Sequence, residues 1–123
     1  MLAKDILGRD GEQLAAAHLL SKGMEILDRN WRCRQGELDI VAADECCLVF
    51  CEVKTRRSNA FGSPLEAVDS RKAARIRRLA MTWLSENPGV HADQRWTELR
   101  FDVVGVICRP GEPAEIVHVE AAF

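Results

Sequence analysis

Three side chains, Asp39, Glu52 and Lys54, have the types and the spacing of a metal-assisted hydrolytic centre. Asp39 falls within one expected strand, and Glu52 and Lys54 end the next. Side chains two residues apart on a strand point to the same face, so Glu52 and Lys54 share a face. If the two strands pair as a hairpin about Asp44-Glu45, Asp39 comes beside Glu52.

Two neighbouring carboxylates repel each other unless a cation joins them. Carboxylate oxygens are the hard ligands that Mg²⁺ prefers, and Mn²⁺ accepts the same donors. Such an ion acidifies a bound water and stabilises the charge that builds on a phosphate. Lys54 could position that water, and Glu12, at an expected helix start, could add a carboxylate from the opposite side. The contrary interpretation is a solvated ion pair between Glu52 and Lys54.

Other charged residues have two interpretations each. Glu37 shares a face with Asp39 and is either a further ligand or second-shell acid, or the partner of Arg34. Lys72 lies at the edge of an apolar helix face, where it either reaches a phosphate or lays its stem over the core. For Arg100 and Asp102, a structural ion pair at the sheet edge is favoured over a catalytic role.

Basic residues that could hold a nucleic-acid backbone occur in two places. Arg56 and Arg57 follow Lys54 on an expected loop, where they are either phosphate contacts or solvated. Arg71, Arg75 and Arg78 line up along one face of a long helix. From residue 29 to residue 78 there are eleven Lys or Arg against seven Asp or Glu, although the whole chain carries a net charge of −2.

The 123-residue chain is expected to form one domain, residues 1–123, without disulfides. Its five cysteines include no C-x-x-C pair, and Cys47 and Cys51 are about 13 Å apart along a strand, too far for one zinc ion. The three histidines are scattered and suggest no cluster. With no apolar segment after a basic start and no run long enough for a membrane span, we expect a cytoplasmic protein without a membrane partner.

The hydrophobic pattern predicts two helices and five strands in the order α-β-β-β-α-β-β, an α/β fold with a mixed sheet and flanking helices. Ser63-Pro64-Leu65-Glu66 has the features of the second helix start. Within that helix, the apolar positions from Ile76 to Leu84 form a buried stripe. The expected helices are 10–22 and 63–86, and the expected strands are 24–31, 37–43, 46–54, 99–108 and 114–119.

Several motifs, in order along almost the whole chain, resemble the YraN-like family of bacterial proteins. That family is grouped with the PD-(D/E)XK nuclease superfamily, near the archaeal Holliday-junction resolvases. Leu38 precedes Asp39 where the superfamily name has a proline. The motifs are Arg29-Asn30-Trp31-Arg32, Gly36-Glu37-Leu38-Asp39-Ile40-Val41, Val49 to Arg56, Phe61-Gly62-Ser63-Pro64 and Arg100-Phe101-Asp102-Val103-Val104.

The resemblance implies a restriction-endonuclease-like core and a magnesium-dependent endonuclease that cuts DNA, including branched DNA. It implies metal-ligand roles for Asp39 and Glu52, catalytic support from Lys54 and an acidic contribution from Glu12. The backbone carbonyl of Val53 and waters would complete the metal shell. Cutting a junction requires two centres, which a homodimer would supply. The alternative is a catalytically inactive nuclease-fold module that binds nucleic acid or a protein partner.

Overall fold

The computed structural model describes residues 3–57, 66, 68–92 and 96–123. Its elements follow the predicted order, with one short additional helix. The helices are α1 (Ala3–Ser21), α2 (Ser70–Glu86) and α3 (Pro88–Ala92), and the strands are β1 (Glu25–Cys33), β2 (Gly36–Asp44), β3 (Cys47–Arg56), β4 (Glu98–Ile107) and β5 (Glu115–Val119).

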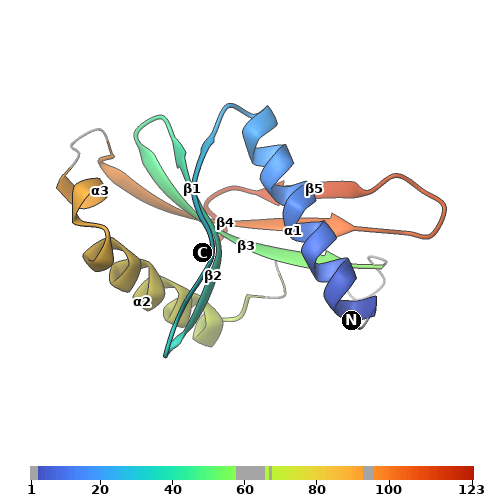
Figure 1. Ribbon diagram of the computed structural model, residues 1–123, viewed down its shortest axis with the longest axis horizontal. Helices are drawn as coiled ribbons and strands as arrows, with labels where there is room; N and C mark the ends of the chain where they lie inside the picture. The colour runs from blue at the N-terminus through green and yellow to red at the C-terminus, as the bar shows by residue number, and fades with distance from the viewer. Residues whose placement is uncertain (1–2, 58–65, 67, 93–95) are drawn as a thin grey trace.

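The five strands form one mixed sheet in the order β1-β2-β3-β4-β5. All neighbours are antiparallel except β3 and β4, which run parallel because the chain crosses over through α2. Figure 1 shows the sheet between two helices, with α1 against one face and α2 against the other. The predicted α/β architecture with flanking helices is confirmed.

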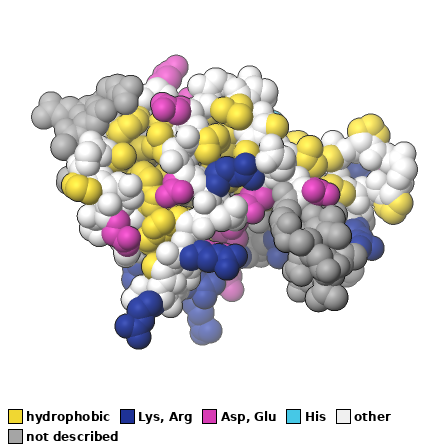
Figure 2. All heavy atoms as spheres, viewed as in Figure 1, with side chains coloured by type: hydrophobic (Ala, Val, Ile, Leu, Met, Phe, Trp, Pro, Cys, Tyr) yellow, Lys and Arg dark blue, Asp and Glu magenta, His cyan; other side chains and the backbone are white. Residues whose placement is uncertain are grey.

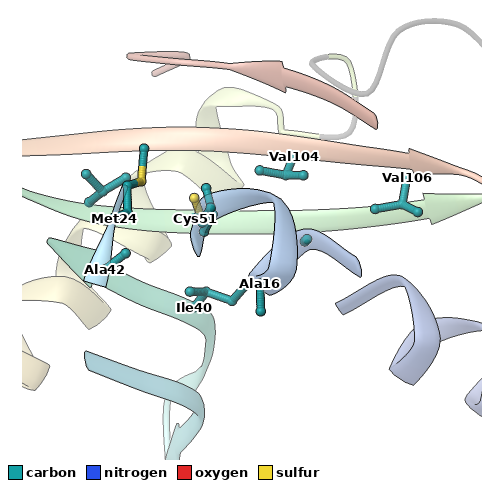
Figure 3. Packing of buried hydrophobic residues seen from close by; sticks show 10 residues of the cluster. Ala16, Met24, Ile40, Ala42, Cys51, Val104 and Val106 are labelled. Atoms are coloured by element: carbon teal, nitrogen blue, oxygen red, sulfur yellow. The ribbon is translucent and has the colours of Figure 1, made fainter. Parts of the chain in front are cut away.

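Alternating strand residues supply two separate cores, one on each face of the sheet. Under α1, small side chains such as Ala16 pack on Ile40, Cys51 and Val104, as Figure 3 shows. Under α2, larger side chains fill the space, and Trp83 lies edge-on to Phe50. The buried face of α2 contains the predicted stripe of Ile76, Leu79, Ala80, Trp83 and Leu84.

The first helix ends where it was predicted to end but begins earlier. Gly23 has a positive φ of 87°, and Met24 N–H donates to the Leu19 carbonyl at 3.1 Å, a Schellman stop. Because α1 begins at Ala3 rather than Asp10, Glu12 lies in the middle of the helix and not in its first turn. None of the described helices is long and apolar enough to span a membrane.

The second helix begins later than predicted. The extended Asp69 is its N-cap and accepts the N–H of Lys72 at 2.8 Å, so the helix starts at Ser70. Glu66 lies outside α2, and residues 63–65 of the predicted start lie outside the described residues. The predicted loop after Lys54 also begins later, because Arg56 still belongs to β3 and pairs with β4.

Candidate metal centre

The two candidate ligands on the sheet lie where β2 and β3 stop pairing. The antiparallel ladder ends at Ile40, opposite Cys51. Continued by one residue, the register puts Asp39 opposite Glu52. At this point the Asp39 side chain replaces the backbone partner, and its Oδ2 accepts the N–H of Val53 at 2.8 Å. In a strand the N–H and C=O of one residue point to the same side, so the Val53 carbonyl also points towards β2.

The carboxylate of Asp39 lies in an environment that disfavours its charge. Burial and the neighbouring Glu52 carboxylate, with smaller contributions from Glu12 and Glu37, together raise its pKa to about 7. The hydrogen bond from Val53 acts in the opposite direction. A carboxylate that accepts a backbone hydrogen bond and still has a raised pKa lacks positive charge nearby, which is the condition that a bound cation would relieve.

Glu12 reaches this region from α1, on the side opposite α2. Asn30 lies opposite Asp39 in the β1–β2 ladder, since its neighbours Arg29 and Trp31 pair with Ile40 and Leu38. With its amide nitrogen turned towards α1, Asn30 donates to both Glu12 oxygens at 2.6 and 2.9 Å.

Burial raises the pKa of Glu12, against the attraction of Arg29. The carboxylates of Glu12, Asp39 and Glu52 do not all lie within 4.8 Å of one another. Glu12 therefore adds negative charge to the site without closing a tight three-carboxylate group.

A lysine from α2 reaches Glu52 directly. Lys72 Nζ lies 2.9 Å from Glu52 Oε1, and both side chains are largely buried. The ammonium of Lys72 thus points towards the site, and its contact with a phosphate stays a prediction. Lys54 follows Glu52 on the same strand face, and its ammonium forms no ion pair with a described side chain.

A cleft of about 480 Å³ opens over these residues between the β1–β2 hairpin and α2. Gly36 at the hairpin tip lies against Leu79 of α2, where a Cβ would come 3.2 Å from Leu79 Cδ1. Figure 2 shows Lys and Arg side chains gathered at the lower end of the molecule, where Figure 1 has the hairpin tip and the start of α2. The charged lining residues are Arg32, Arg34, Glu37, Asp39, Glu52, Lys72 and Arg75.

Some of the remaining candidate residues line this cleft and others do not. Glu37 lines it and pairs with Arg32 at 3.1 Å, because the two are opposite each other in the ladder. The ion pair considered as one of its two interpretations is therefore made with Arg32 and not with Arg34, and the role of Glu37 as a further ligand stays a prediction. Arg75 lines the cleft, whereas the exposed Arg71 and Arg57 are not among its described lining residues. Arg32 and Arg34, which sequence analysis missed as cleft residues, stand out only as basic residues flanking the hairpin turn.

A second polar cluster lies under α1. Asp102 is fully buried and accepts hydrogen bonds from Arg100, His118 and the N–H of Ala121. These contacts lower the pKa of Asp102 although burial alone would raise it. The ion pair with Arg100 was predicted, but it lies on the inner strand β4 and not at the sheet edge.

The histidines at opposite ends of the chain meet in this cluster, contrary to the expectation that they are scattered. His118 Nδ1 lies 3.2 Å from His18 Nε2, so neutral His118 can donate to Asp102 and accept from His18. Cys51, Asp102 and His118 bring ligand atoms within 4.8 Å of one another. Because the Asp102 oxygens are already occupied by donors, we interpret the cluster as a structural network that fixes α1 on the sheet.

Comparison with known proteins bears on this arrangement. The profile of the Uncharacterised protein family UPF0102, the YraN-like family, matches residues 11–106. The chain belongs to the UPF0102 family. A UPF0102 protein of Frankia alni is 57% identical over all of the chain and 98% of that relative. UPF0102 proteins of Acidothermus cellulolyticus and Nocardia farcinica are 53% and 52% identical, each over 98% of the chain and over 96% and 91% of the relative.

The UPF0102 profile begins at Gly11 and ends within β4, so it includes α1 from Glu12 onward, the β2–β3 ladder end and all of α2. The elements that carry Glu12, Asp39, Glu52, Lys54 and Lys72 are therefore family elements. The comparison confirms the predicted family, and the relatives above are named by that family.

Proposed function

We propose that this UPF0102 protein is a magnesium- or manganese-dependent endonuclease that hydrolyses DNA phosphodiester bonds. The observation that carries the proposal is the end of the β2–β3 ladder. There Asp39, which accepts the N–H of Val53, and Glu52 lie in a cleft whose lining also includes four basic residues, Arg32, Arg34, Lys72 and Arg75. Hard oxygen donors with room for waters suit Mg²⁺ or Mn²⁺.

The electrostatics of the cleft support a bound cation. Asp39 has a raised pKa because it is buried beside Glu52, and the Lys72 ammonium lies 2.9 Å from a Glu52 oxygen, so Glu52 already attracts positive charge. When bound, the metal would supply an acidified water and neutralise charge on the phosphate. Asp39 and Glu52 would hold it, and the Val53 carbonyl would complete the protein side of its shell.

The lysines act on the substrate in this proposal. Lys54 shares the face of Glu52, where its ammonium orients the attacking water and offsets charge on the phosphoryl oxygens. When a metal ion offsets the charge of Glu52, the ammonium of Lys72 leaves Glu52 and contacts a phosphate oxygen instead. Glu12, which accepts hydrogen bonds from Asn30, attracts a cation or a metal-bound water from the side of α1.

The basic lining recognises the backbone and not the bases. Arg32, Arg34 and Arg75 surround the cleft without an aromatic platform for base stacking among its described lining residues. Contacts of this kind give affinity that depends on salt and on backbone shape. In this proposal Arg56, Arg57 and Arg71, which are outside the cleft lining, are further candidates for contacts to the backbone. The preference for branched DNA and the use of a homodimer rest on the resemblance to Holliday-junction resolvases.

Metal binding is tested first, by calorimetry with Mn²⁺ on chelator-treated protein. We expect one binding event in the wild type, and loss of that event in Asp39→Asn and Glu52→Gln. Glu25→Gln, which removes an exposed carboxylate at the start of β1 and outside the cleft lining, is the matched control and should leave binding unchanged. Unaltered binding in Asp39→Asn and Glu52→Gln would contradict the assignment of the ligands.

Cleavage is tested on linear, flapped and four-way DNA with Mn²⁺ and with Mg²⁺. We expect products from at least one DNA with the wild type, and none with Glu52→Gln or with chelator. If wild type and Glu52→Gln give the same products, hydrolysis by this centre is refuted. If the wild type binds the metal and DNA but cuts nothing, the chain is a non-catalytic nucleic-acid-binding module.

A further inference from the structure

A second group of potential metal ligands lies at the opposite end of β3 from Glu52. Cys46, the last residue of the β2–β3 turn, precedes β3, Cys47 begins that strand, and Glu98 begins β4. The two sulfur atoms and a carboxylate oxygen all lie within 4.8 Å of one another. Cys47 and Glu52 are five residues apart on one strand, or about 17 Å, so this group is separate from the cleft.

The turn explains why two adjacent cysteines can converge. Neighbouring side chains on a regular strand point to opposite faces. Glu45 has a positive φ of 52°, which ends the regular strand geometry just before Cys46. The side chains of Cys46 and Cys47 therefore do not have to point to opposite faces of the sheet. The sequence argument against a zinc site among Cys46, Cys47 and Cys51 used the separation of Cys47 from Cys51, which do lie in different groups.

Backbone hydrogen bonds and strand pairing hold Glu98 beside Cys46 and Cys47. The Cys46 carbonyl accepts the N–H groups of Thr97 at 2.9 Å and Glu98 at 3.3 Å. In the parallel ladder Cys47 is the direct partner of Glu98, and its thiol donates to Glu98 Oε2 at 3.5 Å. The three ligand atoms are thus brought together by strand pairing, and the thiol proton lies between a sulfur and a carboxylate that a cation could join.

We propose that Cys46, Cys47 and Glu98 bind one divalent cation of the zinc class. Two thiolates and one carboxylate are a donor set for a tetrahedral, borderline-soft ion, with a water in the fourth position. With bonds of about 2.3 Å to sulfur and about 2.0 Å to oxygen, tetrahedral ligands lie about 3.5 to 3.8 Å apart. The side chains need to move by only about 1 Å from separations of up to 4.8 Å.

The site would join the β2–β3 turn to the start of β4. On binding, the two thiol protons pass to the solvent as two metal–sulfur bonds form, so affinity falls as pH falls. Thiolate ligands bind Mg²⁺ poorly, whereas the carboxylates of Asp39 and Glu52 are ligands that suit Mg²⁺. The chain therefore has two cation sites of different chemical preference, one at each end of β3.

The test uses Co²⁺ as a spectroscopic substitute for zinc, on the full chain kept reduced without a thiol reagent. We expect one equivalent of Co²⁺ to give sulfur-to-metal charge-transfer absorption, and one equivalent of Zn²⁺ to abolish it. Excess Mg²⁺ should leave it intact. Cys46→Ser and Cys47→Ser should lose the band, and Glu98→Gln should bind Co²⁺ more weakly.

Two controls keep the test specific. Cys33→Ser removes a thiol at the far end of β1, and Asp39→Asn removes a ligand of the other site; both should keep the band. Thermal unfolding without metal should be similar for Cys46→Ser and the wild type, since Cys46 is exposed. Absence of the band in the wild type, or its persistence in Cys46→Ser and Cys47→Ser, would overturn the proposal.

Discussion

The raised pKa of Asp39 predicts that the metal-free centre destabilises the fold. A carboxyl with a pKa of about 7 in the folded chain and 3.8 in the unfolded chain keeps its proton longer when folded. Its contribution to stability is complete below pH 3.8 and is lost as pH rises towards 7. One pKa unit corresponds to about 1.4 kcal/mol, so the full cost above pH 7 is at most about 4 kcal/mol.

Asp39→Asn removes this cost while its side-chain oxygen can still accept the N–H of Val53. Because water enters the cleft and screens the charges, we expect a gain of about 2 to 4 kcal/mol at pH 8 and almost none at pH 4. The measurement is urea unfolding in chelator at several pH values, with the exposed Asp10→Asn as control for net charge. A constant difference between Asp39→Asn and wild type at every pH would refute the reasoning.

Adding Mn²⁺ should reverse the order. A ligand that binds only the folded chain stabilises it by about 2.7 kcal/mol at a hundred times its dissociation constant. Wild type should gain this stability at pH 8 and Asp39→Asn should not. The variant that is more stable without metal would then be the one that cannot use it, which links stability and function at one residue.

Three further predictions concern residues around the centre. Lys72→Met should bind Mn²⁺ more tightly by calorimetry but cleave DNA more slowly, since its ammonium competes for Glu52 and contacts phosphate; weaker Mn²⁺ binding would contradict this. Burial and His118 lower the pKa of His18, so wild-type stability should fall as pH drops below about 6.5. His18→Gln should flatten that dependence in thermal unfolding at pH 5 to 8. Gly11→Ala should cost about 1 to 3 kcal/mol in urea unfolding, because its Cβ would meet the Thr55 side chain, whereas the unobstructed Gly89→Ala should be nearly neutral.

The order of elements along the chain could be predicted from local patterns, and the position of Asp39 beside Glu52 could be inferred from a hairpin of the two strands. Alternation gives the faces of β2 and β3, and the acidic turn between them sets which residues meet. The start of α2 could not be predicted reliably, since Ser63 and Asp69 are both good helix caps and local sequence does not choose between them. Tertiary packing makes Asp69 the cap.

The missed contacts are those between distant segments. His18 and His118 are 100 residues apart and meet because α1 packs on β3 and β4, next to the strand β5 that carries His118. The link between Glu12 and Asn30 joins α1 to β1, and Asn30 has a positive φ of 54° that the strand pattern does not predict. Lys72 is a boundary residue of an amphipathic helix, so its direction depends on how α2 is rotated against the sheet.

The parallel pairing of β3 with β4 also sets the order in which the centre can form during synthesis. Cys47 of β3 pairs with Glu98 of β4, so β3 emerges from the ribosome 51 residues before its partner. At about 5 to 20 residues per second, one edge of a strand rich in Val, Phe and Cys stays unpaired for roughly 3 to 10 seconds. The β1–β2–β3 meander, with Asp39 and Glu52, can assemble in that interval, but its open edge makes the nascent chain a substrate for chaperones.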